Sequence, residues 1–137
     1  MKKLLLLIII PLSFLSCGKS GDSVPSVPVN FSLPLSDPRL SALNVRGGYA
    51  VFNGVGVAGL ILYRAVDGSY LAYDRCSSYM PQKKCAVTVD DSGFTATDPC
   101  SGSKFSLNDG TPVKAPATRA LRQYSVQVAN FQLSVYN

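Results

Sequence analysis

The sequence predicts an all-β domain, and three observations support this. Short runs of alternating apolar and polar residues recur along the chain and are bounded by turn signals such as Asp-Gly and Asn-Gly. All 8 acidic residues are Asp, which favours turns, and strong helix formers are few. No segment carries a convincing apolar stripe with helical spacing. About nine or ten short strands are therefore expected.

The expected strands follow one another from residue 29 onward. In the first run, Val29, Phe31 and Leu33 alternate with polar residues, and an irregular stretch over 35–46 follows. The Gly-rich stretch 53–59 lies between two apolar runs, so it is expected to be the bend of a hairpin and not a nucleotide-binding loop. The remaining expected strands are 48–53, 55–65, 69–74, 86–90, 93–97, 105–107, 122–128 and 131–136.

The N-terminus has the organisation of an export signal. Lys2 and Lys3 precede an unbroken apolar run over 4–10, which is shorter than the roughly 20 apolar residues of a transmembrane helix. The run leads to Phe14-Leu15-Ser16-Cys17, which resembles the lipobox of bacterial lipoproteins, with Phe14 where Leu is usual. Residues 1–16 are therefore expected to be a lipoprotein signal peptide, and Cys17 is expected to carry the lipid.

A lipid on Cys17 implies a bacterial cell-envelope protein that binds the membrane through its N-terminus. More than one acyl chain makes such an anchor stable, since each buried CH₂ contributes about 0.8 kcal/mol. Gly18, in place of Asp, after the lipid-bearing cysteine favours the outer membrane in a host that has one. Residues 17–28 are rich in Ser, Gly, Pro and Val and are expected to be a flexible tether, followed by one β domain over 29–137.

Composition excludes several classes of function. The formal net charge of +5 falls by two when Lys2 and Lys3 are removed, and no basic run is longer than Lys83-Lys84, so nucleic-acid binding is not expected. The chain contains no His, which excludes His-dependent triads, His-ligated zinc and the usual proton shuttle near neutral pH. Export permits disulfide bonds among the cysteines that follow Cys17.

The second half of the chain contains blocks of a known family. Tyr73-Asp74-Arg75-Cys76 and Asp98-Pro99-Cys100-Ser101-Gly102-Ser103-Lys104-Phe105 look like two cluster-binding loops, and Ala115-Pro116-Ala117 looks like a proline loop. With Leu121-Arg122-Gln123-Tyr124-Ser125-Val126, these blocks resemble the Rieske-type [2Fe–2S] domain, in the divergent form of small bacterial lipoproteins. Two departures are Ala115 for the usual Gly and Ala120 for the usual Pro. The resemblance implies an antiparallel β-sandwich or small barrel with two former cluster loops.

The resemblance also assigns ligand positions. Two Cys and two His hold a Rieske cluster. Carried over residue by residue, Cys76 matches the first Cys, Ser78 stands at the first His, Asp98 at the second Cys and Ser101 at the second His. Only one ligand of the family's set is kept, so no cofactor and no metal are expected. The resemblance further implies a disulfide between Cys85 and Cys100, at positions that brace the two loops in some family members, with Cys76 left as a free thiol.

Other assignments remain open. Cys76 could pair with Cys100 and leave Cys85 free, or the three domain cysteines could hold an atypically ligated [2Fe–2S] cluster with an oxygen ligand from Asp98. The expected function is that of a membrane-anchored, non-catalytic structural or protein-interaction module that meets an unknown envelope protein. An electron-transfer protein is the alternative. A third option is a thiol redox protein that uses Cys76, activated by Arg75, although no Cys-x-x-Cys motif supports it.

Overall fold

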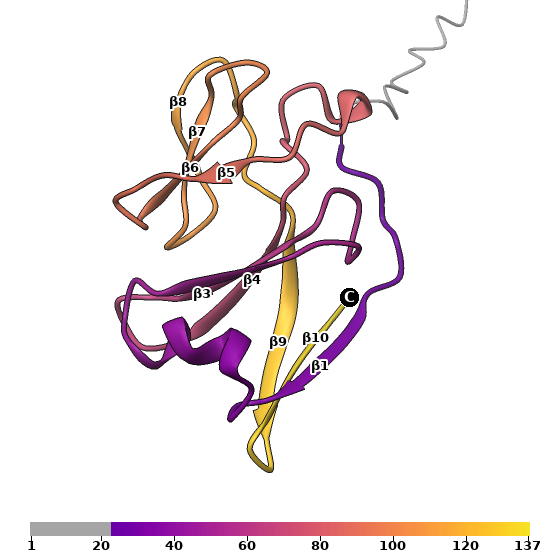
Figure 1. Ribbon diagram of the computed structural model, residues 1–137. Coiled ribbons are helices and arrows are strands. Elements are labelled where there is room, and N and C mark those ends of the chain that lie inside the picture. The colour runs from indigo at the N-terminus through magenta and orange to yellow at the C-terminus, as the bar shows by residue number, and fades with distance from the viewer. Residues whose placement is uncertain (1–22) are drawn as a thin grey trace, which may run out of the picture.

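The computed structural model describes residues 23–137 as ten β-strands and two short 3₁₀ helices (Figure 1). The expected signal peptide, Cys17 and the first part of the expected tether lie outside the described residues. Within residues 23–137, no helix is both long enough and apolar enough to cross a bilayer.

Six strands form the larger sheet, which is antiparallel throughout and has the spatial order β1-β10-β9-β4-β3-β2. Strand β4 joins the two halves of this sheet through a short pairing with β9, in which Ala72 lies opposite Tyr124 and Tyr73 opposite Gln123. The strands are β1 Asn30–Pro34, β2 Tyr49–Phe52, β3 Leu60–Arg64, β4 Tyr70–Asp74, β9 Gln123–Ala129 and β10 Gln132–Tyr136.

The smaller sheet is an antiparallel insertion between β4 and β9, with the order β5-β6-β7-β8. Figure 1 shows it beside one end of the larger sheet. Its strands are β5 Thr88–Val89, β6 Thr95–Thr97, β7 Lys104–Ser106 and β8 Pro112–Lys114. Because this insertion separates two neighbouring strands of the larger sheet, the loops that enter and leave it are brought together.

The predicted all-β class is confirmed, and each expected run contains a strand. Three details differ. The run 55–65 becomes strand only at Leu60, because residues 53–59 form a loop with Gly54, Gly56 and Gly59 at positive φ. Strand β8 was not expected, since it is short, begins with Pro112 and pairs with β7 through an irregular register. The stretch 35–46 contains a 3₁₀ helix, η1 Pro38–Asn44, capped by the Asp37 side chain.

The core lies on both faces of β3. Successive side chains of a strand point to opposite faces, so Leu60 and Leu62 pack into one apolar cluster with η1, β9 and β10, whereas Ile61 and Tyr63 pack into the other with the smaller sheet. All four side chains are fully buried. Residues 59–63 are an almost wholly apolar run, which predicts a central strand, and the burial of these side chains confirms that prediction.

The segment before β1 is part of the folded domain. Val24 is buried, and Arg122 donates hydrogen bonds from Nη1 to the Val24 carbonyl at 3.2 Å and from Nη2 to Ser26 Oγ at 2.9 Å. The Asn137 side chain donates to the Val27 carbonyl. These contacts place the start of the folded part near Val24, not at the expected residue 29, and remove residues 24–28 from the expected tether.

A buried carboxylate holds three parts of the chain together. Asp74, at the end of β4, is fully buried and accepts hydrogen bonds from Val57 N at 2.6 Å, Ala58 N at 3.1 Å, Cys76 N at 2.7 Å and Tyr124 Oη at 2.6 Å. Burial and this hydrogen bond raise the pKa of Tyr124, so its hydroxyl stays protonated and donates. Asp74 therefore fixes the β2–β3 loop, β9 and the start of the loop after β4.

Gly56 allows the β2–β3 loop to come this close. Its φ is +72°, and a Cβ at this position would lie 2.3 Å from Asp74 Oδ2 and 2.8 Å from Tyr124 Oη. Only glycine avoids both the backbone strain and the clash.

We expect Asp74→Ala to lower the free energy of unfolding by at least about 3 kcal/mol, because it leaves several buried donors without an acceptor at about 1–3 kcal/mol each. Tyr124→Phe removes one of these hydrogen bonds and should cost about 1.5 kcal/mol. Urea unfolding followed by circular dichroism measures both. Equal losses in the two variants would contradict a central role for Asp74.

Candidate functional site

Three loops meet at one end of the domain, which we call the loop end. The first loop, 75–87, follows β4; the second, 98–103, joins β6 to β7; the third, 115–121, precedes β9. Hydrogen bonds join the third loop to both others: Ser78 Oγ donates to the Arg119 carbonyl at 2.6 Å, and Ala117 N donates to Ser103 Oγ at 2.9 Å. The loop end therefore collects the blocks that carried the sequence resemblance.

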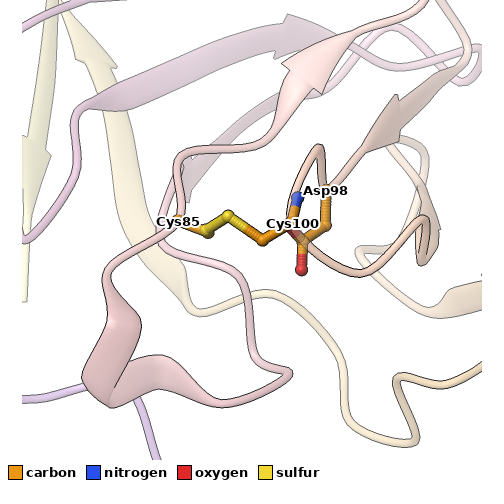
Figure 2. A group of neighbouring side chains, drawn as sticks. All are labelled: Cys85, Asp98 and Cys100. Atoms are coloured by element: carbon orange, nitrogen blue, oxygen red, sulfur yellow. A yellow bond between two sulfur atoms is a disulfide. The ribbon is translucent and has the colours of Figure 1, made fainter.

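A disulfide joins the first loop to the second. Cys85 and Cys100 are bonded to each other, as Figure 2 shows. Their Cα atoms are 6.3 Å apart. The predicted pairing is confirmed, and the alternative Cys76–Cys100 pair is wrong. Within the described part of the chain, Cys76 is the free thiol.

The Cys76 thiol is buried and poorly suited to redox chemistry. Burial, and then the nearby Asp74 carboxylate, raise the pKa of this thiol to about 11, so the reactive thiolate is scarce at neutral pH. The expectation that Arg75 activates Cys76 is wrong, because the Arg75 guanidinium donates elsewhere, to the Val87 carbonyl and Asn53 Oδ1, each at 3.1 Å. The Cys76 thiol itself donates to the Pro81 carbonyl, with Sγ 3.6 Å from the oxygen.

Asp98 is the centre of a buried hydrogen-bond network between the first two loops. Its carboxylate accepts from Ser77 Oγ at 2.7 Å, Ser101 Oγ at 2.6 Å and Cys100 N at 2.8 Å, and both Asp98 and Ser77 are fully buried. Burial alone would raise the pKa of Asp98, but the hydrogen bonds outweigh burial and hold this pKa below its usual value. Asp98 is thus held as a carboxylate that fixes both loops.

Sequence reasoning missed two features of the loop end. Ser77 was not singled out, although it lies between two positions that the resemblance assigned to ligands. The second feature is a hollow of about 240 Å³ between the first and third loops. It is lined by Ser78, Tyr79, Met80, Pro81, Thr118 and Arg119. Neither feature has a sequence signal, because each arises from residues that only the fold brings together.

The four positions assigned to cluster ligands do not suit a [2Fe–2S] centre. They offer one thiol, at Cys76, and no imidazole, since the chain has no His. The Asp98 carboxylate is already bound by serine hydroxyls, one of them from Ser101, and Ser78 donates to a backbone carbonyl. A neutral serine hydroxyl is a poor iron ligand, because oxygen is a harder donor than thiolate or imidazole.

A second group of potential metal donors contains the disulfide. Potential ligand atoms of Cys85, Asp98 and Cys100 lie within 4.8 Å of one another, and Figure 2 shows Asp98 beside Cys100 on the second loop. Metal binding by cysteine needs thiolates, and the sulfur atoms of Cys85 and Cys100 are bonded to each other. In this oxidised form, the group is a covalent and hydrogen-bonded brace between two loops.

We expect reduction of the Cys85–Cys100 bond to lower the free energy of unfolding by roughly 3 kcal/mol, the chain-entropy value for a closed loop of about 15 residues. Amide hydrogen exchange should increase first over 76–104, since this disulfide links the first two loops. The Cys85→Ser/Cys100→Ser variant should match the reduced protein. Uniform loosening of the larger sheet together with the loops would contradict this prediction.

Two solved structures share the fold at low sequence identity. A chain of the complex of reduced oxygenase and oxidized ferredoxin in carbazole 1,9a-dioxygenase has a TM-score of 0.51 and 23% identity, and the match covers 79% of this chain and 93% of that one. The cyanobacterial plasma membrane Rieske protein PetC3 from Synechocystis PCC 6803 has a TM-score of 0.53 and 20% identity, with coverage of 80% and 98%. No protein-family model and no curated protein matches the sequence.

Identities this low carry information about fold and not about chemistry, which depends on the residues of the site. The two matches span most of the described domain and nearly all of each matched chain. The fold implied by the sequence resemblance is thereby confirmed: residues 23–137 have a Rieske-like β fold.

Proposed function

We propose that this protein is a membrane-anchored lipoprotein of the bacterial cell envelope, and that its Rieske-like domain is a non-catalytic structural or protein-interaction module without a cluster. The observation that carries the proposal is the state of the four assigned ligand positions. Cys76, Ser78, Asp98 and Ser101 each form hydrogen bonds within the domain, and they offer one thiol and no imidazole.

The proposal also accounts for how the loops are held together. A Rieske cluster is bound by residues of two loops, so it cross-links them. In this chain, the Cys85–Cys100 disulfide and the buried Asp98 network join the same two loops. The domain therefore has covalent and polar links that support the loop end in place of a cluster.

A non-catalytic role agrees with the chemistry of the described residues. General acid–base and nucleophilic catalysis need groups with a suitable pKa at an accessible site. Cys76 is buried with a raised pKa, and Asp98 is buried and bound by hydroxyl donors. The hollow at the loop end has a mixed polar and apolar lining, which suits contact with another molecule. Its lining residues are Ser78, Tyr79, Met80, Pro81, Thr118 and Arg119.

We expect protein produced together with iron–sulfur assembly machinery to be colourless and to contain no stoichiometric iron or sulfide, because the ligand positions lack the required donors. Metal analysis and visible absorption measure this. The control variant Ser78→His/Asp98→Cys/Ser101→His restores two Cys and two His at the assigned positions and should gain iron. Two irons per native chain, with a charge-transfer spectrum, would instead support the electron-transfer alternative.

We expect Cys17→Ala to release the protein from the membrane fraction or to leave an uncleaved precursor, because the lipid is proposed to be attached at this residue. Cell fractionation and intact-mass spectrometry of the N-terminal peptide test this. Cys76→Ser is the matched control, since it also removes a single cysteine outside the Cys85–Cys100 disulfide and should leave the attachment unchanged. A mature, membrane-bound Cys17→Ala protein would disprove the anchor.

A further inference from the structure

The N-terminal segment leaves the domain at the loop end. A second hollow shares the lining residues Ser78 and Arg119 with the first, and the first described residues of the chain also line it. Figure 1 shows the chain entering the domain next to η2, Pro81–Lys83, on the first loop. The second hollow is lined by Ser23, Val24, Ser78, Arg119, Ala120 and Arg122. Because Arg122 binds the backbone of Val24, this exit point is fixed.

The distance from this exit point to the proposed lipid is short. Even fully extended, the chain from Cys17 to Ser23 spans at most roughly 20 Å. The β9–β10 hairpin, with Phe131 at its turn, lies at the opposite end of the domain in Figure 1. A lipid on Cys17 therefore keeps the loop end, and not the hairpin, close to the bilayer.

The loop end has the chemistry of a surface that binds acidic lipid. Lys83 and Lys84 are exposed, and no acidic residue lines either hollow within the described chain. Met80 is 38% exposed beside the lysines.

We propose that the loop end faces the bilayer that holds Cys17 and binds anionic phospholipid headgroups through Lys83 and Lys84, with Met80 at the headgroup boundary. This inference rests on the proposed lipid anchor. The hairpin end then faces away from the membrane and carries Phe131, which is 85% exposed with φ of 60°.

The interaction is electrostatic and local. Each Lys or Arg near an anionic lipid surface contributes about 1 kcal/mol, and the attraction falls off within a Debye length of about 10 Å at 0.1 M salt. The anchor keeps the loop end within reach, so these modest contributions act at a high effective concentration. Removing both lysine charges should lower the affinity of the loop end for the anionic lipid surface by about thirtyfold.

The test uses the lipidated protein in vesicles of phosphatidylcholine with or without phosphatidylglycerol. A fluorophore is attached at Thr118→Cys on the loop end or at Ala129→Cys near the hairpin turn, both exposed positions. Headgroup spin-labelled lipid should quench the probe at 118 strongly and the probe at 129 weakly.

Quenching of the probe at 118 should require phosphatidylglycerol and decrease as the salt concentration rises. It should be lost in the Lys83→Gln/Lys84→Gln variant. The charge-matched control Arg39→Gln/Arg46→Gln, in and beside η1, should behave as the native protein.

The outcomes separate this inference from the anchor. Mass spectrometry that finds no lipid on Cys17 overturns the anchor, and the proposed orientation with it. A lipidated protein with equal quenching at both probes, or with quenching at 118 unaffected by phosphatidylglycerol, salt and the lysine variant, overturns the loop-end site alone and leaves the anchor standing.

Discussion

The buried carboxylate of Asp74 is the interaction on which the rest of the domain depends. It accepts hydrogen bonds from the β2–β3 loop, from the backbone of Cys76 and from Tyr124 on β9. The pairing between β4 and β9 is only two residues long, so the sheet itself joins its halves weakly. Asp74 sits at that junction, where its side chain adds a hydrogen bond from Tyr124 on β9 and, through Cys76 N, also sets the direction of the first loop.

At the loop end, the carboxylate of Asp98 is a second buried polar group that fixes the backbone around it. Asp98 binds donors from two loops, and the disulfide joins the same loops covalently. Burying a carboxylate is costly unless donors surround it, so Ser77 and Ser101 matter to stability and not only to geometry. The Rieske-like fold can therefore keep its loop arrangement with residues that are poor ligands for iron.

Much of the fold could be predicted from the sequence, because period-2 runs and turn residues are local signals. The apolar run Gly59–Tyr63 identified the central strand, and the Cys85–Cys100 pair followed from the resemblance of the second loop. Strand β8 and the strand boundary at Leu60 were missed, since a short strand with Pro112 has no periodicity and the glycine loop looks apolar. Ser77 and Gly56 could not be identified, because their roles depend on contacts with Asp98 and Asp74 across the fold.

The pairing of β1 with β10 has a consequence for the order in which the sheet can form. Asn30 lies opposite Tyr136, so the first and last strands of the larger sheet are partners. Such long sequence separation makes folding slow, and the sheet cannot close until β10 is available to pair with β1. Until then, β1 has no strand to pair with, and an unpaired strand edge is prone to aggregation. A chain truncated before β10 would lose the partner of both β1 and β9.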